Sequence, residues 1–486
     1  MSDWFLPADE RPWTAGNLVI PRVHGAEYFA RLLEVLEATK DGDRVFLTDW
    51  RGDQDERLAD DGPTVGQVLA AAGRRGVEVR ALLWRSHSDL TRFNAKENQQ
   101  LDMLINETGG EALLDERVRR GGSHHQKLVV VRRRDRHEED VAFVGGIDLC
   151  HGRRDDAEHA GDPQPAPLDE RYGPTPPWHD AMLEIRGPAV AHVLDTFSER
   201  WEDPTPVDHR NPYRALVHRI ARMPRHPEEL PERWEPPPEA GPHQVQVLRT
   251  YPSKRPRYPF APDGERSIAR GYARAFERAR QLVYVEDQYF WSAEIVGPLA
   301  DALRTRPELQ VIAVVPRYPE QDSPVTSPAM HYGQRLAWER LREAGGRRFA
   351  MYDLENRDGV PIYVHAKMCI VDDAWMTFGS DNLNVRSWTH DSELTCAVVD
   401  TEGRLPREVR ASLWAEHLDL PPDDPRLLDL DGATALWAER AADGGRVREH
   451  VPPPVSGLDR LWARPAYRFL LDPDGRPRRL RRSGRF

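Results

Sequence analysis

The chain has 486 residues, and its 80 acidic side chains outnumber its 68 Lys and Arg side chains, which leaves a net charge of −12. This length predicts two or three domains, and the acidic balance disfavours a broad electrostatic footprint for nucleic acid. No apolar run approaches the roughly 20 residues of a membrane span, and the N-terminus lacks a signal-peptide pattern, so we predict a cytoplasmic protein.

The N-terminal part of the chain alternates between helical and strand patterns. Residues 1–25 are expected to form a loop or arm, and an amphipathic helix is predicted over 27–37. The pattern continues with a strand at 44–50, a helix at 65–72, a strand at 77–84, and a polar loop and helix over the site at 86–100. This alternation predicts a largely parallel sheet covered by helices.

A histidine and a lysine then occur two positions apart in an apolar strand pattern. His125 and Lys127 precede Leu-Val-Val-Val, and a small-residue turn, Gly145-Gly146-Ile147-Asp148, follows. Side chains two apart leave an extended strand on the same face. A buried ammonium has to be paired, so packing alone does not explain this arrangement. His124 points to the opposite face and is predicted to be structural.

The middle of the chain is irregular. Residues 152–177 are rich in Asp, Pro and Arg and predict an inserted loop. A strand at 182–185 and a helix at 189–201 follow. Residues 203–242 contain many prolines and fit no periodic pattern, so we interpret them as a linker or a meandering cover.

The same order of elements then returns. It consists of helices at 268–279, 296–303 and 332–344, strands at 281–290, 309–316 and 394–399, a polar loop at 317–330, a His365/Lys367 strand and a Gly379-Ser380 turn. The chain has five lysines, and two of them occupy these paired positions, which favours a compact point charge there. We interpret the repeated order as an internal duplication.

The duplication predicts an α/β fold in four parts. These are a first half (1–202), a Pro-rich linker (203–245), a second half (246–420) and a C-terminal extension with a basic tail (421–486). The tail could contact phosphate or an anionic membrane, although a solvated tail is the favoured interpretation. The three cysteines, Cys150, Cys369 and Cys396, predict free thiols, and no Cys/His spacing predicts a metal or cofactor.

The paired motifs point to a family. His365-x-Lys367-x₄-Asp372 with Gly379-Ser380-x-Asn382, preceded by His125-x-Lys127, resembles the duplicated HKD motif of the phospholipase D superfamily. Flanking segments at 177–180, 284–290 and 384–393 also resemble that family, so the resemblance covers most of residues 40–400.

The resemblance implies two similar α-β-α sandwich halves, packed face to face about a pseudo-twofold axis, with one shared active site. One imidazole would attack phosphorus to give a phosphohistidine, and the other would serve as acid and base. By similarity to bacterial phospholipases D we favour His125 as the nucleophile and His365 as the acid/base. Lys127, Lys367 and Asn382 would hold the oxygens as charge develops.

Further residues receive roles from their place in the family pattern. Asp180 and Glu393 are expected to orient the histidines, Asp372 completes the second motif, and Gly146, Asp148, Gln288 and Ser380 are expected to line the substrate site.

The first motif departs from the family pattern. Arg132 stands where an Asp is expected five residues after Lys127, and the following hairpin is longer than its counterpart in the second half. Asp140, at the end of that hairpin, is a candidate to replace the missing acid.

The leading hypothesis is a phosphodiesterase that hydrolyses phospholipids at a membrane surface, and possible transfer to another alcohol stays open. The protein is expected to be a monomer that needs no cofactor and no nucleic acid, and to be cytoplasmic or peripheral to the membrane. A nuclease with the same two-histidine site is one alternative. A non-catalytic phospholipid- or phosphate-binding module is another, because the first motif is broken.

Overall fold

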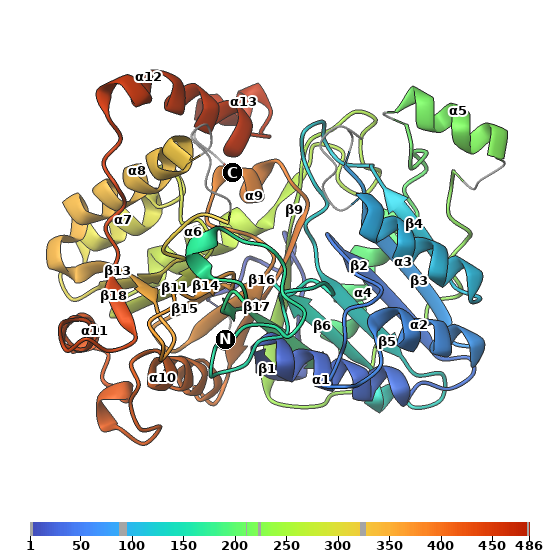
Figure 1. The fold of residues 1–486 in the computed structure, drawn as a ribbon, viewed down its shortest axis with the longest axis horizontal. Coiled ribbons are helices and arrows are strands. Elements are labelled where there is room, and N and C mark those ends of the chain that lie inside the picture. Colours follow the sequence, from blue (N-terminus) through green and yellow to red (C-terminus); the bar gives the residue numbers. More distant parts are fainter. Residues whose placement is uncertain (1–2, 87–94, 210, 222–224, 321–326, 484–485) are drawn as a thin grey trace.

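The computed structural model describes residues 3–86, 95–209, 211–221, 225–320, 327–483 and 486 (Figure 1). The loops predicted within 86–100 and 317–330 therefore lie partly outside the described residues. Within the described ranges, no helix has the length and apolar character needed to cross a membrane.

One large sheet forms the centre of the molecule. Its strands run in the order β18-β13-β12-β11-β15-β16-β17-β9-β1-β8-β6-β5-β2-β3-β4, with β10 beside β9, and β7 pairs separately with β14. The strand bounds are β1 Trp13–Val23, β2 Arg44–Asp49, β3 Glu78–Trp84, β4 Glu111–Asp115, β5 Leu128–Arg132, β6 Val141–Gly145, β7 Trp178–His179, β8 Ala181–Arg186, β9 His243–Tyr251, β10 Glu265–Arg266, β11 Leu282–Asp287, β12 Gln310–Val314, β13 Phe349–Leu354, β14 Tyr363–Val364, β15 Lys367–Val371, β16 Trp375–Gly379, β17 Glu393–Asp400 and β18 Val447–Glu449.

The two halves repeat the same strand pairings, which agrees with the predicted duplication and α/β fold. In the first half β2, β3 and β4 are parallel, and β5, β6 and β8 continue the sheet in antiparallel pairs. In the second half β11, β12 and β13 are parallel, followed by antiparallel β15, β16 and β17. The halves join where β1 pairs with β9, and β16 and β17 of the second half also contact β6 and β8 of the first, so the two halves pack against each other as expected.

Helices cover the sheet and bury three main apolar clusters. One cluster includes α1 and α2, a second includes α6 and α7, and a third spans both halves and includes α4, α10 and α11. The helix bounds are α1 Gly25–Glu37, α2 Val65–Arg74, α3 Ala95–Glu107, α4 Ala189–Trp201, α5 Pro212–Ala221, α6 Ser267–Arg278, α7 Gly297–Thr305, α8 Ser327–Gly345, α9 Val385–Thr389, α10 Leu405–His417, α11 Ala433–Ala442, α12 Gly457–Ala466 and α13 Arg478–Ser483.

Three expectations need correction. Residues 1–25 are not only an arm, because β1 lies at the centre of the sheet; few of its side chains are fully buried, so its apolar pattern is weak. The proposed linker contains α5, and its boundary at 245 cuts through β9. The C-terminal extension is partly built into the sheet, because β18 pairs with β13 at one edge.

Candidate active site

The two histidines stand just before the strands that follow them. β5 begins at Leu128 and β15 at Lys367, so neither histidine belongs to a continuous strand with its lysine as predicted. Instead, each histidine backbone crosses to the other half of the molecule. The His125 amide donates to the Ser392 carbonyl at 2.9 Å, and the His365 amide donates to the His179 carbonyl at 2.7 Å. These matched contacts bring both motifs to one place.

The imidazole side chains repeat this crossing. His125 Nδ1 lies 3.0 Å from Glu393 Oε2, and His365 Nδ1 lies 2.6 Å from Asp180 Oδ2. Both predicted orienting carboxylates therefore contact a histidine, and each belongs to the half that does not supply that histidine. Sequence position alone did not indicate this exchange. Neither half can assemble an oriented imidazole without the other.

The contacts of His125 define its tautomer. Its Nδ1 also lies 3.0 Å from the Ser380 carbonyl oxygen, which can only accept a hydrogen bond. The proton therefore sits on Nδ1, and Nε2 keeps a lone pair for attack on an electrophile. The side chain of His125 is 16% exposed and that of His365 is 7% exposed, so His125 is the more accessible of the two.

Burial and positive charge shape the protonation of the pair. Burial, then Lys127 and Lys367, lower the pKa of His125 well below its usual value, and burial followed by Lys367 and Arg153 does the same for His365. Burial and the nearby Asp391 raise the pKa of Glu393 to about 8. Burial also raises the pKa of Asp180. Both lysines act on both histidines, which supports a single shared site.

The two lysines are buried and point back toward the histidines. Lys127 Nζ donates to the His125 carbonyl at 3.0 Å and pairs with Asp148 at 3.3 Å. Lys367 Nζ donates to the His365 carbonyl and, at 3.2 Å, to Gln288 Oε1. Burial, opposed by Asp180 and reinforced by Lys127, lowers the pKa of Lys367 to about 8. A bound anion would restore the charge balance of this lysine pair.

The small-residue turns hold the orienting carboxylates. A Cβ atom on Gly146 would come within 2.2 Å of Asp180 Oδ1, so the absence of a side chain lets that carboxylate approach. At the matching position of the second half, Ser380 Oγ donates to Glu393 Oε2 at 2.5 Å. These contacts give both residues a positioning role, and their predicted binding of substrate stays a prediction.

Three other predicted residues, Asn382, Gln288 and Asp148, are also buried. Gln288 lies at the site, because it bridges Lys367 and the Tyr363 hydroxyl. Asn382 is buried, and its side-chain oxygen has no hydrogen-bond partner, so its predicted contact with substrate stays a prediction. Asp148 lies near Lys127. Burial raises the pKa of Asp148, but Lys127, a hydrogen bond with Asp49 and the charge of Arg153 together bring this pKa below its usual value.

The position of Asp372 gives no support to a catalytic role. It follows β15 at the end opposite to Lys367, and its carboxylate accepts backbone N–H groups from Arg280, Gln281 and Leu282. Asp140, the proposed substitute in the first half, pairs with Arg132 at 2.7 Å at the corresponding strand end. Both acids are structural, because the motif acid closes a turn away from the histidines.

Three further residues of the site were not predicted from the sequence. Arg153 stacks on Trp178, with 3.7 Å between its guanidinium carbon and the ring centroid, and its Nε atom is buried without a hydrogen-bond partner. Asp49 and Asp287 end matching strands, and each accepts a backbone N–H from the turn that carries Asp148 or Asn382. An acid at the end of the same strand in both halves was the available signal.

The assembled site presents two oriented imidazoles, two buried ammonium groups, a guanidinium and an amide. This set fits a phosphodiester, because the cations neutralise the non-bridging oxygens while one imidazole attacks and the other transfers a proton.

Comparison with known proteins agrees with this chemistry. A family model described as Phospholipase D matches residues 51–296, and one described as Cardiolipin synthase, PLD-like domain, matches residues 272–414. Phospholipase D alpha 4 of Arabidopsis thaliana is 26% identical over 476 residues, covering 76% of this chain and 60% of the plant protein. Phospholipase D alpha 2 of Oryza sativa subsp. japonica is 26% identical over 459 residues, covering 72% and 53%. The chain thus spans between half and two thirds of these relatives.

The fold has a solved counterpart. A phosphatidylserine synthase of Haemophilus influenzae superposes with a TM-score of 0.57 and 14% sequence identity, covering 90% of this chain and 96% of that one. The first family model spans just over half of the chain, and the second extends the match through the His365 motif. The chain belongs to the phospholipase D superfamily.

Proposed function

We propose that this protein is a phospholipase D-type phosphodiesterase that cleaves the bond between the phosphate and the head group of a phospholipid. The observation that carries the proposal is the crossed pairing of His125 with Glu393 and of His365 with Asp180. This pairing supplies one oriented nucleophile and one oriented proton carrier in the same site.

In the first step, Nε2 of His125 attacks phosphorus and the bond to the head-group oxygen breaks. His365 gives its Nε2 proton to the departing alcohol, which leaves a phosphatidyl group on His125. In the second step, neutral His365 takes a proton from water, the resulting oxygen attacks phosphorus, and the phosphorus–nitrogen bond breaks. The products are phosphatidic acid and the free alcohol, and both histidines return to their starting states.

The proton carrier needs a bound anion to be charged. Burial and the neighbouring lysine lower the pKa of His365, so its imidazole is neutral in the free protein. A phosphodiester placed between Lys127 and Lys367 adds negative charge beside the ring and favours the imidazolium. Asp180 accepts the Nδ1–H and stabilises the same charged form. Substrate binding therefore prepares the acid.

A direct test incubates the purified protein with phosphatidylcholine vesicles and, separately, with single-stranded DNA. We expect choline and phosphatidic acid to form, and a denaturing quench at alkaline pH within one turnover, which preserves the phosphorus–nitrogen bond, to trap lipid phosphorus on His125. His125→Ala and His365→Ala should abolish choline release. DNA cleavage without lipid turnover would assign the site to a nuclease, and lipid binding without turnover of either substrate would favour a non-catalytic module.

Transfer to an alcohol other than water is a second candidate activity. The match of residues 272–414 to a cardiolipin synthase-like domain favours it. The phosphatidyl-histidine formed in the first step can react with any alcohol that reaches His365. Adding glycerol or ethanol to the assay separates the outcomes, because transfer yields a new phospholipid and hydrolysis yields only phosphatidic acid.

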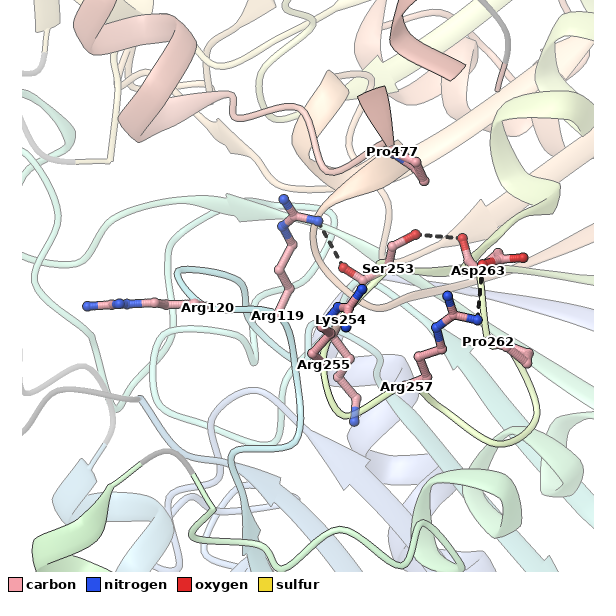
Figure 2. Close-up of a pocket in the computed structure, with 9 residues that line it drawn as sticks. All are labelled: Arg119, Arg120, Ser253, Lys254, Arg255, Arg257, Pro262, Asp263 and Pro477. Atoms are coloured by element: carbon pink, nitrogen blue, oxygen red, sulfur yellow. Dashed lines mark hydrogen bonds and ion pairs between the residues drawn. The ribbon is translucent and has the colours of Figure 1, made fainter. Parts of the chain in front are cut away.

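The proposed substrate lies in a bilayer, and two helices have suitable surfaces. α12 and the turn after it expose Leu458, Leu461, Phe469 and Leu470, and α5 exposes Tyr213, Leu216 and Ile220. In Figure 1, α12 and α5 both lie along the upper edge of the molecule, α12 toward the left and α5 toward the right. A cavity of about 550 Å³ is lined by Arg119, Arg120, Lys254, Arg255 and Arg257 and by Pro477 of the C-terminal segment. Figure 2 shows these side chains.

We infer that this edge contacts an anionic lipid surface, because exposed apolar and basic side chains together favour such surfaces. A Leu458→Glu/Leu461→Glu variant should lose most of its co-sedimentation with phosphatidylglycerol vesicles. Leu428→Glu, which alters an exposed leucine in a different segment, is the matched control. Equal vesicle binding by both variants would contradict the inference.

A further inference from the structure

A second cluster of titratable side chains lies directly behind the His365 site. It contains the imidazoles of His24, His159, His179 and His417 and the carboxylates of Glu286 and Glu416. These residues come from the β1–α1 junction, the loop at 152–177, β7, the end of α10, and β11. The tertiary fold therefore gathers both halves of the chain around one small volume. The mechanism proposed above uses none of these side chains.

The donor atoms are close enough to share one ion. Glu416 Oε2 lies 2.9 Å from His24 Nε2, and Glu416 Oε1 lies 3.0 Å from His159 Nε2. One ligand atom each from His24, His159, His179 and Glu416 falls within 4.8 Å of all the others. Donors on a common zinc ion, with bonds of about 2.1 Å, lie roughly 3.0–3.4 Å apart, so small side-chain rotations would complete the site.

The tautomer of His159 requires a cation at this position. Its Nδ1 lies 3.1 Å from the Trp178 carbonyl oxygen, which can only accept, so Nδ1 carries a proton. The Nε2 lone pair of that tautomer would then face a carboxylate oxygen of Glu416 at 3.0 Å. Two lone pairs repel at this distance. Either an additional proton or a metal ion has to lie between them.

Further features fit a built site. His159 and His179 are fully buried, and Nδ1 of His24 and Nδ1 of His179 have no hydrogen-bond partner. Glu286 accepts from Nε2 of His179 at 2.6 Å, which leaves the other ring nitrogen of His179 available. His24 and His159 both have positive φ, of 71° and 54°, a conformation that L residues seldom adopt without a constraint. The carboxylate of Glu416 is 17% exposed and provides an entry path.

We propose that His24, His159, His179 and Glu416 bind one divalent transition-metal ion, with zinc as the best chemical fit. Three imidazoles and one carboxylate form a closed four-coordinate set, which is typical of a structural ion and leaves no position for substrate. Glu286 supports the set from outside by holding His179. The proposal stands on this cluster alone and does not depend on the catalytic proposal.

The ion would fasten the segment that orients His365. His179 is a ligand, its carbonyl accepts the His365 amide, and the next residue, Asp180, holds His365 Nδ1. The same ion joins the first half to α10 of the second half through Glu416. Its role is to fix the interface that the crossed His–carboxylate pairs require.

The test is the metal content of the full chain, purified from zinc-supplemented cells without chelator or affinity metal and measured by plasma mass spectrometry. We expect about one zinc per chain. His159→Ala and Glu416→Gln should retain less than a tenth of it. Glu286→Gln should weaken zinc affinity by about 10- to 100-fold. The matched control is His450→Ala, which removes a buried histidine bound to Asp353 outside the cluster and should keep its zinc.

A spectroscopic readout separates metal loss from misfolding. Cobalt(II) added to the metal-depleted wild-type protein should give the strong visible absorption of a tetrahedral site, with a stoichiometry of one, and should raise the melting temperature. Folded His159→Gln, verified by circular dichroism, should show neither change. Wild-type protein without bound zinc and without a response to cobalt would overturn the proposal and identify an additional proton as the cation. Zinc retained by both His159→Ala and Glu416→Gln would also overturn it.

Discussion

The two halves of the chain share one skeleton and differ at the positions that touch the chemistry. In the first half Gly146 makes room for Asp180, whereas in the second Ser380 donates to Glu393. Asp148 pairs with Lys127 in the first half, and Asn382 stands at the equivalent turn position in the second. The proton on Nδ1 of His125 is set by a carbonyl, and His365 has no such contact among the bonds described. A symmetric scaffold therefore supports two different roles.

The two halves also use different acids to hold the turn that follows the His/Lys motif. Asp372 accepts three backbone N–H groups from the residues that lead into β11. In the first half Arg132 stands in its place, and the acid lies instead at Asp43, before β2, where it accepts the backbone N–H of Arg134. In the first half the carboxylate therefore lies on the segment just before β2, and in the second half it lies on the turn itself. The broken first motif is thus compensated locally and leaves His125 in place.

The largest expected effect distinguishes the two histidines. His125→Ala and His365→Ala should each lower kcat/KM for phosphatidylcholine by at least about 10³-fold. A phosphatidyl ester with a p-nitrophenolate leaving group needs no proton, so it should restore formation of the covalent intermediate in His365→Ala and not in His125→Ala. Rapid-quench kinetics measures this difference. The opposite pattern would exchange the two roles.

The next largest expected effect on activity comes from loss of the positive charge of Lys367. The pKa of Lys367 is about 8, so its ammonium is present below pH 8 and is lost above it. We expect kcat/KM to fall more steeply above pH 8 than below it, by about one further factor of ten per pH unit, because the charge that stabilises the developing oxyanion disappears. Lys367→Arg should be less active at pH 7 and should show no such steepening up to pH 9.5.

The matched control for this profile is Lys40→Arg, at an exposed site, which should follow the wild-type curve. An unchanged alkaline limb in Lys367→Arg would assign the titration to a different group.

A smaller effect compares the two turns. Gly146→Ala places a methyl group against Asp180 Oδ1 and should displace the acid that orients His365, lowering kcat by about 10- to 100-fold. Ser380→Ala removes one hydrogen bond to Glu393 and leaves the carboxyl in place, so a decrease of less than tenfold is expected. Steady-state kinetics with a melting curve for each variant provides the measurement. Equal effects would show that the two turns are interchangeable.

The smallest expected effect tests whether Asp372 has a structural role and not a catalytic one. Asp372→Asn should lower the free energy of unfolding by about 1–2 kcal/mol, because it weakens the acceptor for three N–H groups, and Asn tolerates the φ of 51° found there. Urea unfolding measures the loss. Asp43→Asn, the counterpart in the first half, should behave similarly. Activity per folded molecule should stay within about twofold, and a large loss would restore a catalytic role to Asp372.

Local patterns predicted much of the scaffold. The apolar runs at β2, β3, β11 and β12 and the amphipathic face of α1 were sufficient to predict the alternating elements and the duplication. β1 was not predicted, because most of its side chains are only partly buried and its sequence therefore lacks a strong apolar pattern. Cooperative pairing in the centre of a sheet, and not the pattern of β1 itself, decides that this segment is a strand.

The sequence by itself determined the types and spacing of the reacting groups, because two His-x-Lys motifs in matching contexts indicate one chemistry. The resemblance to the phospholipase D superfamily, and not spacing alone, indicated that Asp180 and Glu393 would orient the histidines. Only the tertiary structure decided that these pairs cross between halves, that Asp372 closes a turn, and that His24, His159, His179 and Glu416 meet. Spacing along the chain encodes contacts within a strand or helix turn. Contacts between residues hundreds of positions apart depend on how the strands of both halves pair in one sheet.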